Sequence, residues 1–383
     1  MKRFLLLFAL LALPAAAAPM LVAEGEPETV FRWAAQRCDA LHIPDSPARA
    51  VRLPDGSLML VAAHYTNVPL RGRDFGNLAP DCAAAGRGAE NPDPASFDDR
   101  FWVQAVLPLP DGRVLGLASH EFMGKRHAGA CAVTEGPGWT RCWYSSITVV
   151  VARAPAWRFG PLPLPGRVIA ASPEAYSGTT PRRTGFFTTS NIVLPDGHAH
   201  VLSYTEGVPG QPRGNCLLRA PLSDAVAGWR ALAADGTFRL HLGMGRDAEP
   251  CATVTIPGYE GPVRSVVRLG ADGPFVGVLA GRARDAATGQ MAEGVFQVAS
   301  DDLRRWSAPR LLLAATPFRS QPDPGLYYAY PSLIDHESSS PVFDTAEGGA
   351  LRLYLTRFNL AEDRRAGMNR DLVRWRVRVT GPG

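Results

Sequence analysis

The segment FWVQAVLPLPDGRVLGLASHE, residues 101–121, decides the fold class. Two runs of β-forming residues flank a Pro-Asp-Gly turn, and this combination predicts a β-hairpin. Similar acidic or glycine turns interrupt apolar runs at four other places in the chain, at residues 53–56, 194–197, 270–273 and 346–349. A hairpin that recurs along the chain indicates repetition of one β-sheet unit.

Turns that end in tryptophan lie between these hairpins. The tryptophans are Trp157, Trp229, Trp306 and Trp375. Ser300-Asp301-Asp302-Leu303 precedes Trp306, and an aspartate in such a turn accepts hydrogen bonds from backbone amides two residues further on. Because a large ring fills the space that widens between radiating sheets, we expect these tryptophans to pack between adjacent sheets and to have no chemical role.

The two interleaved repeats predict an all-β fold, a single five-bladed β-propeller with four strands in each blade. The first hairpin is expected to pair residues 49–53 with residues 58–64. A ring of sheets needs closure, because an open edge strand can pair with other chains. We expect the closing strand to come from residues 30–33 and to pair with the C-terminal strand at residues 374–380.

The N-terminus predicts export. It reads Met1-Lys2-Arg3, then an apolar stretch, then small residues that end at Ala18, which is the order found in a secretory signal peptide. Residues 19–383 are then the propeller domain, in the periplasm or outside the cell. The net charge of +4 comes without a concentrated basic face, so nucleic acid is not an expected partner. No later segment is long and apolar enough to span a membrane, and we expect a monomer.

Six cysteines follow the N-terminal segment, an even number that favours disulfides in an oxidising compartment. Cys131 and Cys142 flank a Gly-Pro-Gly turn, so we expect them to close one loop. The pairs Cys216–Cys251 and Cys38–Cys82 follow by elimination. The spacing fits neither a zinc ribbon nor a redox motif, and we expect no metal and no other cofactor.

The hairpins at Asp-Gly turns, together with turns of the form Ser-x-Asp-Leu-x-x-Trp, resemble the five-bladed β-propeller glycosidases, the group of arabinanases, fructosidases and related furanosidases. The turns are also similar to the Asp box of sialidases, although here the box lacks its glycine and the blade count is five rather than six. The resemblance covers most of the mature chain and implies a carbohydrate substrate or ligand. It also implies an aspartate in each of the first two blades. Asp99 matches the second, and the first blade offers only Asp45, in the irregular setting Ile43-Pro44-Asp45-Ser46.

The strand ends opposite the Asp-Gly turns are expected to meet at one mouth of the central channel. Nine residues after the glycines of four turns stand Tyr65, Glu121, Glu206 and Arg282, and Arg357 holds the matching place in the last repeat. These positions are mostly polar or bulky although the runs before them are apolar. Such a pattern is typical of side chains placed at a rim or in a pocket.

Glycoside hydrolysis uses two carboxyl groups on either side of the scissile bond, one of which is held protonated. Glu121 precedes Phe122 and Met123, and apolar surroundings raise the pKa of a carboxyl group. We therefore expect Glu121 to be the general acid, with Asp99 and Glu206 as candidates for base or nucleophile. The alternative is that Glu121 and Glu206 form structural salt bridges at the strand rim.

The substrate-binding residues that we expect at the same mouth are His120, Tyr144, Asn191, Arg264, Tyr330 and Arg357. Arg264, Arg282 and Arg357 can grip an acidic sugar through bidentate hydrogen bonds, and the alternative is that they are solvated or pair with acids of the chain. The leading interpretation is an exported glycoside hydrolase. Two others stay open: a non-catalytic propeller that binds carbohydrate or a cell-wall ligand, and a metal-centred hydrolase or lyase.

Overall fold

The computed structural model of the protein describes residues 20–135, 140–318, 326–347, 349–361 and 366–381. The expected signal peptide, residues 1–18, lies outside these described residues. Almost all regular structure within them is β-strand. None of the helices in the described ranges is long and apolar enough to cross a membrane. The helices are α1 (Trp33–Gln36) and the 3-10 helices η1 (Cys82–Ala84), η2 (Pro94–Ser96), η3 (Gly124–Arg126) and η4 (Leu222–Asp224).

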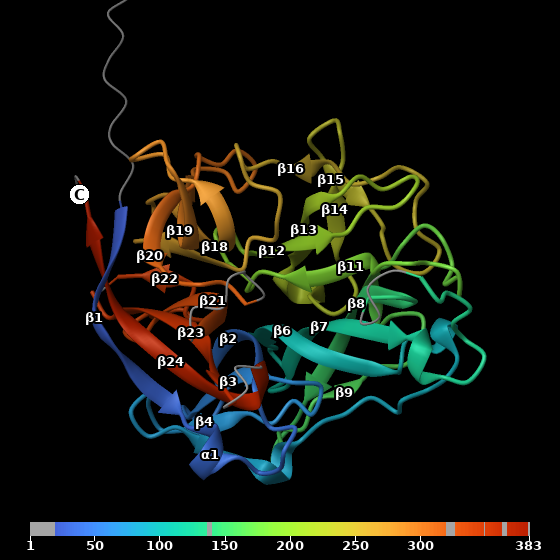
Figure 1. Cartoon of the computed structure of the whole chain (residues 1–383), viewed down its shortest axis with the longest axis horizontal. Coiled ribbons are helices and arrows are strands. Elements are labelled where there is room, and N and C mark those ends of the chain that lie inside the picture. Colours follow the sequence, from blue (N-terminus) through green and yellow to red (C-terminus); the bar gives the residue numbers. More distant parts are fainter. Residues whose placement is uncertain (1–19, 136–139, 319–325, 348, 362–365, 382–383) are drawn as a thin grey trace, which may run out of the picture.

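The strands fall into five groups that follow the chain order, except that β1 joins the last group and β22 the fourth (Figure 1). The first group is β2 (Pro44–Arg52), β3 (Leu58–Ala63), β4 (Leu70–Gly72) and β5 (Ala79–Pro80). The second is β6 (Arg100–Pro108), β7 (Val114–Met123), β8 (Trp143–Ala152), β9 (Gly160–Pro161) and β10 (Val168–Ala170). The third is β11 (Thr184–Thr189), β12 (His198–Thr205), β13 (Gly214–Pro221), β14 (Arg230–Leu232), β15 (Phe238–Leu240) and β16 (Thr253–Val254).

The fourth group is β17 (Ser265–Leu269), β18 (Phe275–Arg284), β19 (Met291–Ser300) and β20 (Arg310–Ala314), with β22 (Thr345–Ala346) parallel to β17. The fifth is β21 (Tyr327–Asp335), β23 (Leu351–Leu360), β24 (Ala366–Thr380) and β1 (Met20–Phe31). The predicted all-β fold is confirmed. A parallel pair between β8 and β11 joins the second and third groups into one sheet, so the count of five blades stays a prediction.

The hairpin turns have the expected geometry. Gly56 and Gly112 adopt φ of 81° and 82°, a conformation that other residues rarely reach, and each donates its N–H to the residue before the proline. The turn at residues 270–273 differs, because its positive φ lies at Gly270 rather than at the last glycine. These turns define one end of each hairpin and leave the opposite strand ends to form the other face.

The N-terminal strand closes the structure against the C-terminal strand. β1 pairs antiparallel with β24, in a register that sets Met20 opposite Thr380 and Thr29 opposite Val373. Figure 1 shows the two strands side by side. The predicted closure is confirmed, but the closing strand begins at Met20 and ends at Phe31, so it is longer and earlier than residues 30–33.

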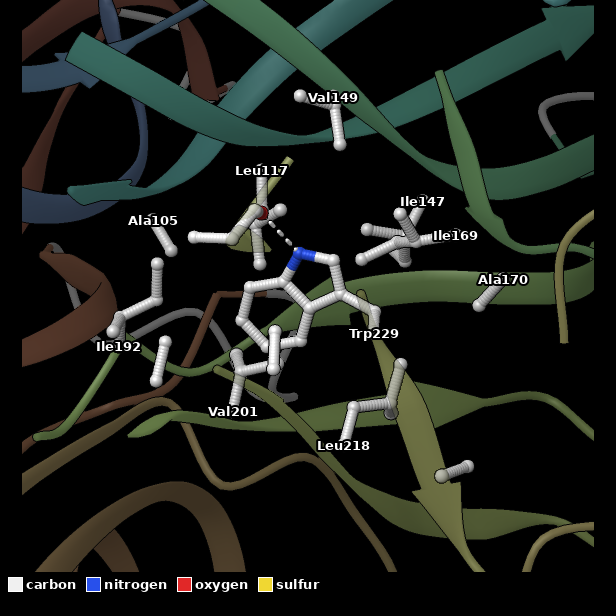
Figure 2. Close-up of a cluster of buried hydrophobic side chains, with 14 of the residues drawn as sticks. Ala105, Leu117, Ile147, Val149, Ile169, Ala170, Ile192, Val201, Leu218 and Trp229 are labelled. Atoms are coloured by element: carbon white, nitrogen blue, oxygen red, sulfur yellow. Dashed lines mark hydrogen bonds between the residues drawn. The ribbon is translucent and has the colours of Figure 1, made fainter. Parts of the chain in front are cut away.

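The hydrophobic core is divided among the interfaces between neighbouring groups. Trp229 packs against side chains from β6, β7, β8 and β12, among them Leu117, Ile147 and Val201 (Figure 2). Its indole N–H donates to the Ala225 carbonyl at 2.7 Å, which satisfies the one polar atom of the ring. The other three tryptophans of the repeat also lie in such clusters, each between two strand groups: Trp157, Trp306 and Trp375. The predicted packing role of the tryptophans is confirmed.

Arg49 of β2 occupies the axis around which the groups are arranged. The inner strands follow one another around this axis, since β2 touches both β6 and β21, β6 touches β11, and β21 touches β17. Hydrogen bonds between Asn191 and Val266 join the third and fourth groups. The acceptors of the Arg49 guanidinium are the carbonyls of Ala48, Gln104, Thr189 and Arg264 and the hydroxyl of Ser332. These acceptors come from all five strand groups. Burial lowers the pKa of Arg49 to about 9, so the group is still charged at neutral pH.

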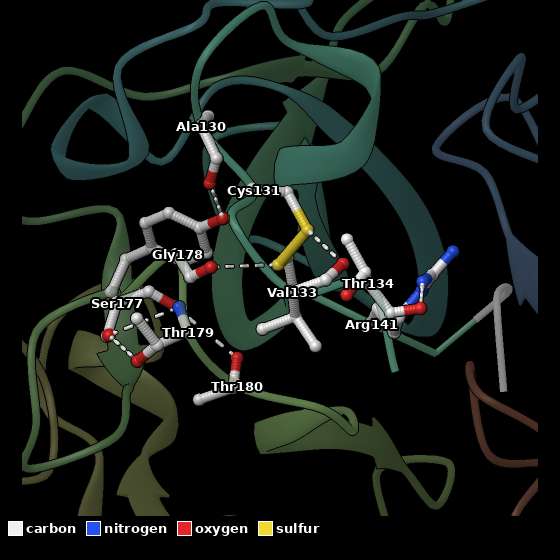
Figure 3. The surroundings of a disulfide bond; sticks show 11 residues. Ala130, Cys131, Val133, Thr134, Arg141, Ser177, Gly178, Thr179 and Thr180 are labelled. Carbon is white, nitrogen blue, oxygen red and sulfur yellow. Dashed lines mark hydrogen bonds between the residues drawn. A yellow bond between two sulfur atoms is a disulfide. The ribbon is translucent and has the colours of Figure 1, made fainter. Parts of the chain in front are cut away.

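All three predicted disulfides are confirmed: Cys38–Cys82, Cys131–Cys142 and Cys216–Cys251. Figure 3 shows the surroundings of Cys131–Cys142, which closes the loop between β7 and β8 beside the segment of Gly178. The described residues include no free cysteine.

Candidate active site

Glu121 is a buried carboxyl group near the end of β7. It lies directly opposite Arg100 in the β6–β7 ladder, and only 5% of the residue is exposed. Burial raises the pKa of Glu121 to about 8; the positive charges of Arg183 and Arg100 oppose this shift, and the negative charge of Asp45 adds to it. Glu121 is therefore neutral and carries its proton at pH 7, which is the state that a general acid needs.

Asp45 is the second carboxyl group of the site. It stands near the start of β2, and both of its oxygens accept hydrogen bonds. The Tyr330 hydroxyl donates to Oδ1 at 3.0 Å, the Trp102 indole donates to Oδ2 at 3.3 Å, and the Arg370 guanidinium also donates to Oδ1. His64 Nε2 lies 3.7 Å from Oδ2. These donors hold the carboxylate in one orientation at the end of the inner strand.

A β-bulge aims Tyr330 at this site. The β21–β23 register shifts between Ala329 and Ser332, and Tyr330 adopts φ of 58°, which is unusual for a bulky residue. Such bulges and strained residues often redirect a side chain near a functional site. The ring of Tyr330 lies 5.9 Å from the Arg264 guanidinium. Burial raises the pKa of Tyr330, so its hydroxyl keeps the proton that it donates to Asp45.

Glu206 forms an ion pair with Arg183. Arg183 Nε donates to Glu206 Oε1 at 2.9 Å, and the guanidinium also lies 3.1 Å from the centroid of the Phe187 ring. Glu206 thus forms the kind of salt bridge that the structural alternative predicted for it. Glu121 differs, because the hydrogen bond described for its carboxyl group comes from the Ser119 hydroxyl, at 3.4 Å.

A pocket of about 430 Å³ adjoins these residues. Its charged lining residues are Arg183, Arg213, Arg264, Arg282, Glu206 and Glu260. A larger hollow of about 930 Å³ lies beside the hairpin turns of Asp55 and Asp111. Each of these aspartates is bonded within its own turn, to Ser57 and Arg113 respectively. We therefore place the candidate site at the pocket of about 430 Å³, because its lining residue Arg183 also acts electrostatically on the buried Glu121.

Asp99 and His120 are directed away from Glu121. Side chains alternate between the two faces of a strand, so the neighbours of Arg100 and Glu121 point to the opposite face. Asp99 accepts hydrogen bonds from the Met123 amide at 3.2 Å and from His127 Nε2 at 3.0 Å. The Asp99 amide donates to His120 Nε2, so in the neutral ring the proton is on Nδ1. Nδ1 donates this proton to the Ser146 hydroxyl on β8. Burial lowers the pKa of His120 to about 3.

Tyr144 shares that opposite face, because it lies across from Phe122 in the β7–β8 ladder. Its neighbouring rings are Phe97 and Tyr176, and burial raises its pKa to about 12. The structure therefore brings Tyr144 together with Asp99 and His120, but not with Glu121. The catalytic and binding roles expected for these three residues stay predictions without a shared pocket to support them.

Asn191 and Arg357 have partners within the scaffold. The Asn191 side chain donates from Nδ2 to the Val266 carbonyl at 2.8 Å, and its Oδ1 accepts from the Val266 backbone N–H at 2.7 Å. Asn191 therefore bridges the third and fourth groups. Arg357 donates to Asp371 at 2.8 Å, and Asp371 also accepts from the Trp33 amide. Neither side chain has a described contact with Asp45, Glu121 or the pocket. Of the expected residues, Glu206 and Arg264 line the pocket. Tyr330 lies beside Arg264, and Glu121 is linked to the pocket through the electrostatic effect of Arg183.

Sequence reasoning did not select Asp45, Arg183 or Arg370 for the site. In the described ranges, no group of three or more His, Cys, Asp or Glu side chains is placed to hold a metal ion.

The chain was compared with known proteins. No model of a known protein family matches it, and no curated protein sequence matches it. Among solved structures it is similar to a candidate exo-β-1,3-galactanase from Bifidobacterium bifidum, with 12% identity over 93% of this chain and 97% of the other, at a TM-score of 0.48.

Two further similar structures are an α-L-arabinanase from Cellvibrio cellulosa and the catalytic domain of an α-L-arabinofuranosidase from Coprinopsis cinerea. The first has 12% identity over 89% of this chain and 91% of the other, at a TM-score of 0.46. The second has 10% identity over 95% and 98%, at a TM-score of 0.45. The arabinanase group named from the sequence motifs is thus among the structures to which this chain is similar, while the fold assignment above rests on the strand pairing itself.

Proposed function

We propose that the protein is an exported glycoside hydrolase in which Glu121 is the general acid and Asp45 is the base or nucleophile. The observation that supports this most is the asymmetry between two neighbouring carboxyl groups. Burial keeps Glu121 protonated at neutral pH, whereas Asp45 accepts hydrogen bonds from a phenol, an indole and a guanidinium. A carboxyl group that burial keeps protonated, together with one that accepts several hydrogen bonds, fits the acid and the base of glycoside hydrolysis.

The proposed reaction uses the proton on Glu121 and the acceptor oxygens of Asp45. Glu121 donates its proton to the oxygen of the scissile glycosidic bond as that bond breaks. Asp45 either takes the proton of an attacking water or attacks the sugar carbon itself, and in the second case water later releases the sugar. Trp102 and Tyr330 meet the same carboxylate with the polar edges of their rings. Aromatic rings beside the reacting groups can pack against the apolar side of a sugar ring.

Export is supported by two features. The charged and then apolar start of the sequence fits a secretory signal peptide. All six cysteines are paired in disulfides, which persist in oxidising compartments outside the cytosol.

A glycan screen with variants tests the proposal. The wild type is screened for hydrolysis of a panel of oligosaccharides and of aryl glycosides with good leaving groups. We expect Glu121→Gln and Asp45→Asn each to lower kcat on oligosaccharides by roughly 10²–10⁴-fold, the usual contribution of a positioned acid or base. Glu121→Gln should lose much less activity on the aryl glycosides, since a good leaving group departs without a proton.

The control is Glu174→Gln, which removes an exposed carboxylate outside the site and should leave the rate unchanged. If Glu121→Gln cleaves oligosaccharides at the wild-type rate, Glu121 is not the acid. A wild type that binds glycans and cleaves none of them would favour the non-catalytic alternative.

A further inference from the structure

Arg264 is a partly buried cation, and no carboxylate lies within hydrogen-bonding distance of it among its described contacts. Its guanidinium donates one long hydrogen bond, from Nη1 to the Thr188 hydroxyl at 3.4 Å, and lies near the edge of cation–π range from Tyr330 at 5.9 Å. Burial lowers the pKa of Arg264, which reports the unfavourable desolvation of its charge. A charge that is partly removed from water without a paired carboxylate is costly, and such groups commonly serve a ligand.

Three other arginines of the chain, Arg374, Arg370 and Arg49, have their charge or their N–H groups satisfied by the protein. Arg374 forms two hydrogen bonds with Glu28 at 2.9 and 2.8 Å, and Arg370 is paired with Asp45. Arg49 has no carboxylate, but its N–H groups meet acceptors on all sides at the axis. Arg264 has neither arrangement, although it lines the pocket beside the proposed catalytic pair.

The pocket around Arg264 is positive overall. Four arginines and two glutamates line it, which leaves an excess of two positive charges. One glutamate, Glu206, is already engaged by Arg183. Arg213 is directed to the Tyr204 hydroxyl, to which it donates at 2.5 Å. Glu206 therefore acts on Arg264 only through its electrostatic field, and no carboxylate oxygen is described in hydrogen-bonding contact with Arg264.

We propose that this pocket binds an anionic group carried on a sugar, a carboxylate or a sulfate ester, with Arg264 as its principal contact. The planar fork of a guanidinium matches two oxygens of such a group. The proposal deepens the proposed function, on which it rests, because it makes an acidic glycan the substrate class. The anionic residue lies beside the scissile bond, since Arg183 lines the pocket and acts electrostatically on Glu121.

Binding measurements on Glu121→Gln test this without turnover. The probes are methyl glucuronide and methyl galacturonide, their neutral counterparts methyl glucoside and methyl galactoside, and galactose 6-sulfate against galactose, measured by calorimetry or ligand-observed NMR. We expect at least one acidic probe to bind at least tenfold more tightly than its neutral counterpart. A uronide preference identifies a carboxylate site, and preference for the sulfated sugar identifies a sulfate ester.

Adding Arg264→Gln to the same background should remove the preference while thermal melting shows a folded protein. Arg87→Gln is the matched control, because Arg87 is half-exposed and pairs with Asp39. This variant should keep the preference for the acidic probe. In the Arg264-intact background, raising the salt concentration should weaken acidic probes and leave neutral ones unchanged.

Equal affinity for acidic and neutral probes, or a preference that survives Arg264→Gln, overturns the proposal. The two hypotheses fail separately. Cleavage of neutral glycans that depends on Glu121, without any acidic preference, keeps the hydrolase and rejects the anion pocket. Arg264-dependent binding of an acidic sugar without any hydrolysis keeps the pocket and rejects the enzyme.

Discussion

Burial makes Glu121 a neutral acid in the folded protein, and this state has a consequence for stability. The pKa of Glu121 is about 8 when folded, against an ordinary value of 4.5. Between these pH values the folded state keeps a proton that the unfolded state has released. The contribution of Glu121 to stability is therefore complete below pH 4.5 and is lost as pH rises through about 8.

Replacing Glu121 should remove that pH dependence. We expect the free energy of unfolding of Glu121→Gln, relative to wild type, to rise between pH 5 and pH 8 by about 2–5 kcal/mol. Urea denaturation at the two pH values measures the change, with Glu174→Gln as the exposed control. A difference between variant and wild type that is the same at both pH values would show that Glu121 is ionised in the folded protein.

The sequence identified Glu121 from its apolar neighbours, and burial is indeed the main cause of its raised pKa. It did not separate Glu121 from His120, although adjacent residues in a strand point to opposite faces. Asp45 was named but set aside. Its partners Tyr330 and Arg370 lie 285 and 325 residues away along the chain, so local sequence carries no sign of them.

At the scale of elements, strand limits explain the missed carboxylate. The inner strand of the first group was predicted to start at Arg49. The structure starts β2 at Pro44, so Asp45 stands near the beginning of this inner strand. The register shift between Pro44 and Arg49 shows why, since an irregular pairing hides the alternation that marks a strand.

The disulfide Cys38–Cys82 joins the segment after α1 to η1, and its two cysteines are 44 residues apart in the sequence. Closing a loop of that length restricts the unfolded chain, and we expect Cys38→Ser with Cys82→Ser to lower the free energy of unfolding by about 4 kcal/mol. The matched pair Cys131→Ser with Cys142→Ser spans 11 residues, so its loss should be smaller, about 3 kcal/mol. Urea denaturation without reductant compares them. An unchanged midpoint for the longer loop would contradict the expectation.

At the scale of the whole molecule, the repeats of the sequence predicted the closure and the tryptophan packing, because both follow from one unit used again. They did not predict what fills the axis. Inner strands have one edge without a neighbouring strand, and carbonyls of four groups are directed at Arg49. A single arginine among forty basic residues carries no sequence signal for that position.

Arg49 should therefore be one of the most sensitive positions of the chain. Arg49→Met keeps an apolar stem but leaves buried carbonyls without donors, and each such loss costs about 1–3 kcal/mol. We expect the free energy of unfolding to fall by roughly 3–5 kcal/mol in total, with Arg49→Lys less damaging because it keeps a charged donor. Arg87→Met, at a half-exposed arginine, should change the free energy of unfolding by less than about 0.5 kcal/mol.

Arg49 also donates a hydrogen bond to the Arg264 carbonyl at 2.6 Å, so the acidic-sugar preference should weaken in Arg49→Lys even where the protein stays folded. Chemical denaturation of the three variants, followed by the uronide titration of Arg49→Lys, examines both effects. Stability of Arg49→Met within 1 kcal/mol of wild type would mean that the five strand groups hold together without their common donor.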